Sequence, residues 1–233
     1  MPIGVIVDCS ATALGGIFGA LLGKYIPQKI KTFLPLVFAV CCLGIGISLI
    51  IQAKALSAVM LAVILGSVVG GVVDIDQGFK VCVDKIQTKL SKNTEDEQSQ
   101  AAMSSILSLI VLFCFGTTTI LGSLTEGLSG DASILIMKSI LDFFTAMIFA
   151  CSLRYLVALI AIPQFVISIL LFLLATLIMP LVSGDMLSDF KACGGLITFA
   201  TGIRMSGMKD IKSSNMLPAL IFALPISWLW SML

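Results

Sequence analysis

Apolar runs about as long as one membrane-spanning helix follow one another along almost the whole chain. They lie at residues 3–23, 34–52, 55–73, 102–122, 132–153, 155–179, 190–207 and 214–232. A helix needs about 20 apolar residues to cross the hydrocarbon core of a bilayer. The chain is also only 12% charged, whereas soluble domains carry about 25% charged residues. The sequence therefore predicts an all-α membrane protein, a polytopic bundle of about eight transmembrane helices in a single domain over residues 1–233.

The distribution of Lys and Arg predicts an orientation, because cytoplasmic loops are enriched in basic residues. If the first loop is cytoplasmic and the sides then alternate, most basic residues fall on the cytoplasmic side. They are Lys24, Lys29, Lys31, Lys80, Lys85, Lys89, Lys92, Arg154, Arg204, Lys209 and Lys212. The external loops then hold Glu126, Asp131, Asp185 and Asp189. We therefore expect both termini to be external.

The connection at residues 74–100 is the longest polar one. Its apolar residues Phe79, Val83, Ile86 and Leu90 recur at the spacing of one helix face, with lysines between them. A cytoplasmic amphipathic helix of this kind either lies on the inner leaflet, where lysines reach anionic headgroups, or packs against the end of the bundle. Both arrangements stay open.

An internal repeat is a second open question. The first three runs and the last three start from opposite sides of the membrane in this topology. Each group has a Pro in its first loop, Pro27 or Pro180, followed by a Gly-rich span. This similarity indicates either an inverted repeat of spans 1–3 and 6–8, as in many transporters, or a chance likeness between Gly-rich helices.

Small residues form a stripe on the first span. Gly15, Gly19 and Gly23 share one helix face, and Gly66 and Gly70 repeat the spacing on the third span. Without a Cβ, such faces let two helix backbones approach closely. We favour packing within one chain, and the alternative is a homodimer formed through Gly15, Gly19 and Gly23.

A pair of charged residues lies in the middle of the fifth span. Lys138 and Asp142 are four residues apart, so that their side chains share a helix face and can form an ion pair. A charged side chain at the centre of a bilayer costs about 2.5–3.5 kcal/mol on insertion scales, so the pair must face the bundle interior or a wet cavity. It is either an ion- or solute-binding site or a structural pair that fixes the helix register.

Other polar residues are candidates for the same site. Thr117, Thr118 and Thr119 follow Gly116 in the fourth span, where hydroxyls either act as ligands or bond back to their own helix. Gln164 follows Pro163, and Asn215 precedes Leu217-Pro218. Asn215 is a ligand candidate, although an N-cap of the last span is the favoured interpretation.

The residues in several of these segments resemble a known family. Gly15-Gly-Ile-Phe-Gly19, Phe113-Cys-Phe-Gly116, Lys138-Ser-Ile-Leu-Asp142 and Asn215-x-Leu-Pro218 are similar to the pattern of the YdfK/YqgA-like family, a domain of unknown function in bacterial multi-pass membrane proteins. The resemblance covers nearly the whole chain. Asp8 stands where we expect an Asn in that family. The resemblance implies a bacterial cytoplasmic (inner) membrane protein, often labelled a transporter, and implies no substrate.

Composition argues against several classes of function. The net charge of +1 gives no reason to expect a nucleic-acid partner. The chain has no His, which removes the commonest general base and the imidazole metal ligand. We see no paired carboxylates on facing spans and no nucleotide-binding segment, so we expect neither an enzyme nor a cofactor or metal site.

Two hypotheses of different classes remain. The first is a secondary transporter or channel-like protein for a small solute or ion, embedded in the lipid bilayer, with its polar site on spans 4 and 5. The second is a non-transporting scaffold or accessory subunit that acts through protein contacts. In the second hypothesis the Lys138–Asp142 pair is structural, and the outer faces of the Gly stripes contact the partner.

Overall fold

The computed structural model describes residues 1–78, 81, 85, 106–107, 109–110 and 113–232. Its α-helices are α1 (Ile3–Leu22), α2 (Gln28–Ile50), α3 (Leu56–Val73), α6 (Thr117–Ser129), α7 (Ser133–Leu153), α8 (Ala161–Ile178), α9 (Gly184–Met205) and α10 (Pro218–Trp230). Four 3-10 turns join them, η1 (Gly23–Tyr25), η2 (Arg154–Ile160), η3 (Met179–Leu181) and η4 (Ser213–Met216). The described part of the chain is therefore helical and contains no strand.

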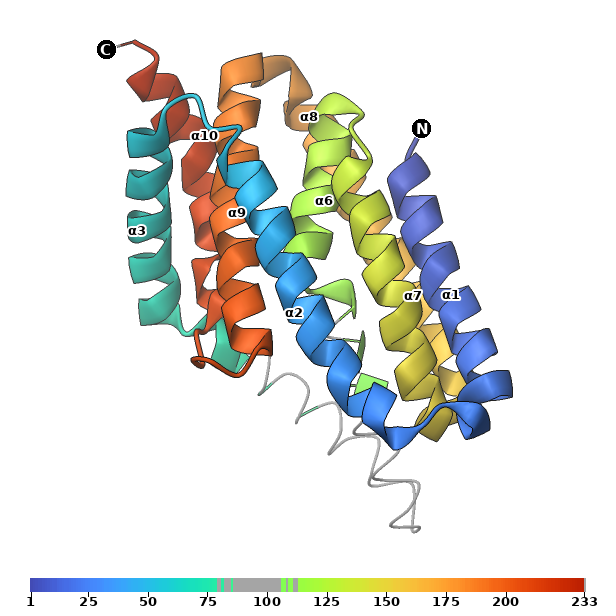
Figure 1. Ribbon diagram of the computed structural model, residues 1–233. Coiled ribbons are helices and arrows are strands. Elements are labelled where there is room, and N and C mark those ends of the chain that lie inside the picture. Colours follow the sequence, from blue (N-terminus) through green and yellow to red (C-terminus); the bar gives the residue numbers. More distant parts are fainter. Residues whose placement is uncertain (79–80, 82–84, 86–105, 108, 111–112, 233) are drawn as a thin grey trace.

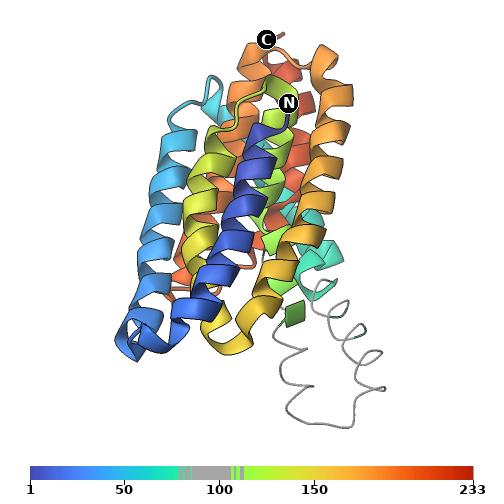
Figure 2. The ribbon, with the colours of Figure 1, turned by 90° about the vertical axis from the view of Figure 1, so that its right-hand side faces the viewer.

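The helices form one bundle in which neighbours along the chain are not always neighbours in space. The most extensive contacts join α1 to α7, α2 to α9, α3 to α10 and α6 to α8. Both termini lie at the same end of the bundle, together with the α2–α3, α6–α7 and α8–α9 connections (Figure 1). Seen from the side, α1 and α7 run next to each other along their whole length (Figure 2).

Five stretches within the described residues are long and apolar enough to cross a membrane. They are Ile3–Leu22, Gln28–Ile50, Leu56–Val73, Ser133–Leu181 and Ser213–Trp230. Large apolar side chains cover much of the outer surface of these stretches. A surface of this kind is solvated by lipid tails, whereas the helices bond their own backbone groups.

The fourth predicted span, 102–122, is placed wrongly. The helical turn that contains Phe113 ends before Phe115, the chain bends at Gly116 (φ −57°, ψ 139°), and α6 then runs from Thr117 to Ser129. The hydroxyl of Thr119 donates to the Phe113 carbonyl at 2.9 Å, which satisfies an acceptor that the bend frees. The apolar run thus belongs to a discontinuous helix, because the extended backbone at Gly116 ends the helical hydrogen-bond pattern there.

Two other helices begin earlier than their apolar runs. α2 starts at Gln28 rather than near residue 34, and α9 starts at Gly184 rather than near residue 190. The α9 start has a local cause, because the Ser183 hydroxyl accepts a hydrogen bond from the Met186 amide as an N-cap. Hydropathy detects the apolar part of such a helix and misses its polar first turns.

The glycine stripe of α1 packs inside the chain, against α7. A Cβ at Gly15 would lie 2.2 Å from the Phe143 carbonyl oxygen, and one at Gly19 would lie 2.2 Å from that of Met147. A Cβ at Gly23 would lie 2.8 Å from the Cα of Cys151. The favoured interpretation of the stripe therefore matches the structure. The homodimer through Gly15, Gly19 and Gly23 stays a prediction.

Several expectations lie outside what the structure describes. Most of the predicted amphipathic segment at residues 74–100 is among the residues without a described placement. The inverted repeat stays a prediction. So does the total number of spans.

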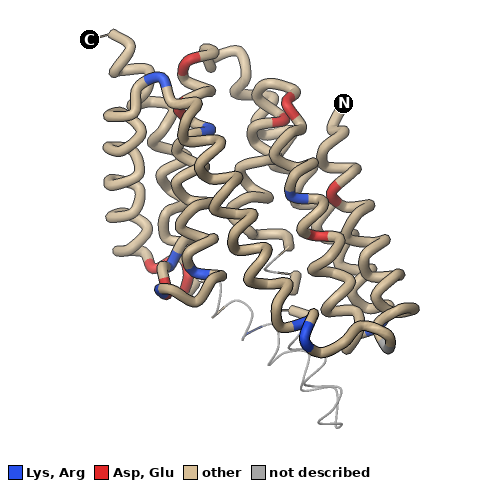
Figure 3. The backbone as a smooth tube through the Cα atoms, in the orientation of Figure 1, with Lys and Arg blue, Asp and Glu red and all other residues tan. Residues whose placement is uncertain are grey.

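Charged residues lie mostly near the two ends of the bundle, with a smaller group between them (Figure 3). At the end that holds the termini, Lys191 pairs with Asp131 at 2.6 Å. At the opposite end, Lys212 pairs with Asp74 at 3.0 Å, and Arg204 pairs with Asp76 at 3.0 Å. These pairs join α9 and the segment after it to the α6–α7 loop and to the end of α3.

Because of the Lys191–Asp131 pair, we expect the stability of the protein to vary with pH in the acid range. Partial burial raises the pKa of Asp131, but hydrogen bonds from Lys191 and Ser133 outweigh it and lower the pKa to about 2. A carboxyl with a depressed folded-state pKa stabilises the fold above its unfolded pKa of about 3.9, and this contribution is lost as the pH falls towards the folded value. We expect Lys191→Gln to weaken the loss of thermal stability between about pH 4 and pH 2. An unchanged pH profile in detergent, measured beside Asp131→Asn, would contradict this assignment.

Candidate functional site

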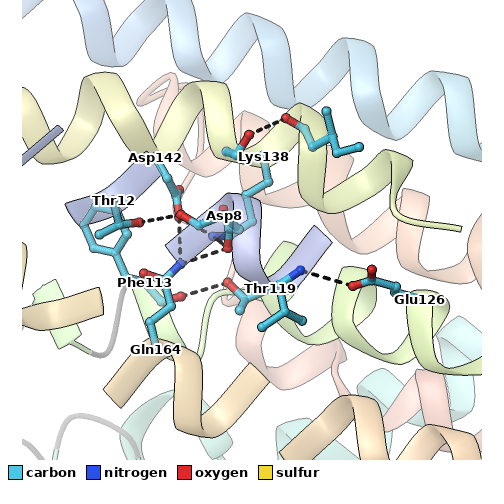
Figure 4. A network of polar contacts seen from close by, with 11 residues as sticks. Asp8, Thr12, Phe113, Thr119, Glu126, Lys138, Asp142 and Gln164 are labelled. Carbon is cyan, nitrogen blue, oxygen red and sulfur yellow. Dashed lines mark hydrogen bonds and ion pairs between the residues drawn. The ribbon is translucent and has the colours of Figure 1, made fainter. Parts of the chain in front are cut away.

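Four polar residues from three helices meet in the interior of the bundle, and we call them the buried cluster. They are Asp8 on α1, Lys138 and Asp142 on α7, and Gln164 on α8 (Figure 4). Their exposed fractions are 1%, 6%, 9% and 0% in that order. The predicted Lys138–Asp142 pair is therefore present and faces the interior, as the cost of charge in lipid requires.

The two carboxylates of the buried cluster share the same two donors. Lys138 Nζ donates to Asp8 Oδ2 at 2.9 Å and also to Asp142 Oδ2. Gln164 Nε2 donates to the same two oxygens, at 2.8 Å to Asp8 and at 3.2 Å to Asp142. One ammonium and one amide thus hold two carboxylates together, where a simple ion pair would hold one.

The local sequence explains how these side chains converge. Lys138 and Asp142 are one turn apart on α7, so both reach the same side of that helix. The glycines of α1 allow its backbone to touch α7, which brings Asp8 within reach of Lys138. Gln164 lies in the first turn of α8, just after η2, and points back towards α7.

The bend in the discontinuous helix lies beside the buried cluster. Phe113, in the turn before the bend, packs with Ala146 and Ile160, which are one helical turn from Asp142 and Gln164 respectively. Figure 4 shows Phe113 and Thr119 next to Gln164. The end of one helical segment and the start of another therefore face the same polar region.

A further carboxylate ties α6 to α1. Glu126 is 1% exposed and accepts hydrogen bonds from the backbone amides of Gly4 at 2.6 Å and Val5 at 3.1 Å (Figure 4). These amides belong to the first turn of α1, where backbone donors have no partner within the helix and the helix dipole favours a negative charge. Glu126 was expected in an external loop and instead caps a helix inside the bundle.

The remaining predicted site residues are distributed around this region. Thr119 bonds to the Phe113 carbonyl, and Thr117 shares a hydrogen bond of 3.0 Å with Thr201 of α9. Thr118 is half-buried. The three threonines thus line the start of α6, and the predicted location of the site on spans 4 and 5 omits the contributions of α1 and α8.

Asn215 lies elsewhere, at the end of the bundle opposite the termini. Its side chain accepts from the Asp76 amide at 2.7 Å and donates to Asp74 at 3.2 Å. It is neither a member of the buried cluster nor the N-cap of α10, which begins without a side-chain cap. The N-cap interpretation is wrong, because the Asn215 side chain bonds to Asp74 and to the Asp76 amide instead. A ligand role for Asn215, away from the buried cluster, stays a prediction.

Asp8 is the functional candidate that sequence reasoning did not select. It lies in an apolar run, as Asp142 does, but its closeness to the N-terminus also suggested a place at the membrane interface. The expectation that no two carboxylates face each other across spans is also wrong, because Asp8 was not recognised as the partner of Asp142. A Lys ammonium lies between Asp8 and Asp142, which distinguishes them from a free acid–base pair.

A separate cavity of about 640 Å³ lies between α6, α8, α9 and α10. Its walls are apolar and include Leu128, Ala175, Phe190, Leu224 and Trp228. No residue of the buried cluster lines it. The cluster is therefore closed off from this cavity in the present conformation.

Apolar helices around an interior group of shared charges define a helical membrane protein. The chain matches the family described as "Protein of unknown function (DUF554)" over residues 3–228, and it belongs to that family. It is 42% identical over 231 residues to "Uncharacterized protein YqgA" of Escherichia coli (strain K12), with 99% of this chain and 98% of that protein covered.

A second relative carries a membrane description. The chain is 24% identical over 218 residues to "Uncharacterized membrane protein YdfK" of Bacillus subtilis (strain 168), with 94% of this chain and 92% of that protein covered. No solved structure matches this chain. The expected family is thus confirmed.

Proposed function

We propose that this protein is a secondary transporter for a small solute or ion, with the buried cluster as its binding site. The observation that carries the proposal is the sharing of one Lys138 ammonium by the carboxylates of Asp8 and Asp142, all buried between apolar helices. Ionisable residues within membrane-spanning helices are expensive to keep and mark ion and substrate pathways. Transport requires such a site together with a segment that can move.

The discontinuous helix supports the same proposal. In many secondary transporters the site lies where a helix is interrupted, because the interruption exposes backbone groups and allows one segment to move against another. Here the bend at Gly116 lies beside the buried cluster, and α6 starts directly after it. Rotation of α6 about this bend is a means of opening the closed cluster to one side of the membrane.

The alternative, a scaffold or accessory subunit, has less support. In that hypothesis, the partner would contact the outer faces of the Gly stripes. Gly15 and Gly19 contact α7, and Gly66 and Gly70 contact Ala219 and Asn215. Neither stripe offers a free surface to a partner.

We also propose an orientation in a bacterial cytoplasmic membrane. The end of the bundle away from the termini carries Lys29, Lys31, Arg154, Lys209 and Lys212. Because basic residues are enriched in cytoplasmic loops, this end is the cytoplasmic one and both termini are external.

The transport proposal predicts a ligand-dependent stability that requires Asp142. We would measure thermal unfolding of the purified protein in detergent against a panel of cations, anions and small metabolites. A ligand at 100 times its Kd stabilises the protein by about 2.7 kcal/mol. We expect at least one compound to stabilise the wild type and to lose its effect in Asp142→Asn.

A matched control separates binding from general damage. Asp189 on α9 is another buried carboxylate, bonded to the Lys54 and Ala55 amides and to Ser227 and to no residue of the cluster. Asp189→Asn should lower stability but keep the ligand effect. Absence of any ligand effect in the wild type, or its survival in Asp142→Asn, would favour the scaffold.

A further inference from the structure

We infer that the buried cluster is a proton-binding site that holds one proton, shared by Asp8 and Asp142, in the closed conformation. The role of this proton as the coupling ion of transport rests on the proposed function. Its presence in the cluster does not, and it can be measured separately.

The first argument is the balance of charge. With all three groups ionised, two carboxylates and one ammonium leave a net charge of −1 in the cluster. Asp8, Lys138 and Asp142 are only 1%, 6% and 9% exposed as whole residues, so water screens little of the excess charge. Two carboxylates in one site cannot both stay ionised without compensation, and one of them takes up a proton. One proton makes the cluster neutral.

The second argument is the geometry of the carboxylates. Both Oδ2 atoms face the same Nζ and the same Nε2, so the two carboxylates approach each other through a shared pair of donors. Asp8 Oδ1 and Gln164 Oε1 are buried acceptors without a hydrogen-bond partner among the described residues. A proton on either carboxyl supplies a donor to a site in which these buried acceptors lack one.

The other titratable groups that surround the cluster do not supply the missing positive charge. In the described part of the chain they are the thiols of Cys9 on α1, Cys42 on α2 and Cys114 before the bend. A thiol is either neutral or negative. Glu126 on α6 accepts from the amides of α1, and a carboxyl group carries no positive charge in either form. A proton is therefore the simplest source of neutrality.

Opening of the site would release this proton. When water reaches the cluster, the penalty for a second ionised carboxylate falls, and both Asp8 and Asp142 can ionise. Closure restores the penalty and requires a proton again. A proton exchanged on each cycle of opening and closing is what a proton-coupled transporter needs.

Infrared spectroscopy of the full protein in a detergent that contains no ester group tests the inference directly. A protonated carboxyl group has its own C=O stretch, whereas exposed Asp and Glu are ionised near neutral pH and do not contribute to that band. We expect the wild type to show the band at neutral pH and to lose it as the pH rises. Asp8→Asn and Asp142→Asn should each lack the band, because each leaves one carboxylate for one ammonium.

The control is Glu126→Gln, which removes a buried carboxyl outside the cluster and should keep the band. Absence of the band in the wild type, its persistence in both Asp variants, or its loss in Glu126→Gln would each overturn the inference. The transport proposal is judged separately, by the ligand-dependent stability. If the infrared band is present but no ligand stabilises the protein, the bound proton is upheld and the transport proposal is overturned. If a ligand stabilises the protein but the band is absent, transport is upheld and the bound proton is overturned.

Discussion

Replacement of Lys138 by Met should destabilise the protein more than any other single substitution in the buried cluster. Met keeps much of the length and the apolar stem of Lys but removes the ammonium, so that Asp8 and Asp142 lose their common partner. Removing one member of a buried ion pair costs about 3–5 kcal/mol, because an uncompensated charge stays behind. We expect a loss of this size in thermal or denaturant unfolding in detergent.

A rescue experiment identifies the cause of this loss. The triple variant Asp8→Asn, Lys138→Met, Asp142→Asn has no charge left in the cluster and should regain much of the stability lost in Lys138→Met. The single variants Asp8→Asn and Asp142→Asn should be milder, since each keeps one carboxylate beside Lys138. If the triple variant is no more stable than Lys138→Met alone, loss of packing rather than uncompensated charge explains the effect.

The second large effect is expected at the contact between α1 and α7. A Cβ introduced by Gly19→Ala would lie 2.2 Å from the carbonyl oxygen of Met147 and 2.7 Å from its Cα. The obstacle is backbone, which cannot rotate away as a side chain can, so α1 and α7 must separate. Overpacking costs about 1–3 kcal/mol, and we expect the upper end of that range, measured as unfolding in detergent.

Gly44→Ala is the matched control, because a Cβ at Gly44 on α2 would meet nothing within 4 Å. Ala is favoured over Gly in a helix by about 1 kcal/mol, so this variant should be neutral or slightly more stable. The two Gly-to-Ala changes are thus expected to have opposite signs. Equal effects would mean that helix propensity, and not the close contact, determines the result.

The sequence predicted those features that depend on local spacing. Lys138 and Asp142 pair because they are one turn apart on one helix, and any fold that keeps the helix keeps that relation. The apolar runs predicted most of the helices for the same reason. The Gly stripe predicted a close helix contact, and the structure supplies α7 as the partner.

The features that the sequence did not predict depend on contacts between distant segments. Asp8 joins Lys138 across 130 positions of the chain, and Gln164 joins Asp8 across 156. No periodicity in the sequence indicates a contact between such distant residues. The bend at Gly116 was also missed, because an apolar run of span length predicts one continuous helix. Gly116 and the threonines after it do not by themselves indicate where the backbone leaves that helix. A charge in an apolar run is the one local sign that could have selected Asp8.

The two hydrogen bonds of Glu126 have a mechanical consequence. α6 begins directly after the bend at Gly116. Near its other end, Glu126 accepts hydrogen bonds from the first turn of α1. The segment from the bend to Glu126 therefore acts as a lever whose far end is attached to the helix that bears Asp8. In the proposed transport movement, a rotation of α6 would pull on α1 and change the distance between Asp8 and Lys138.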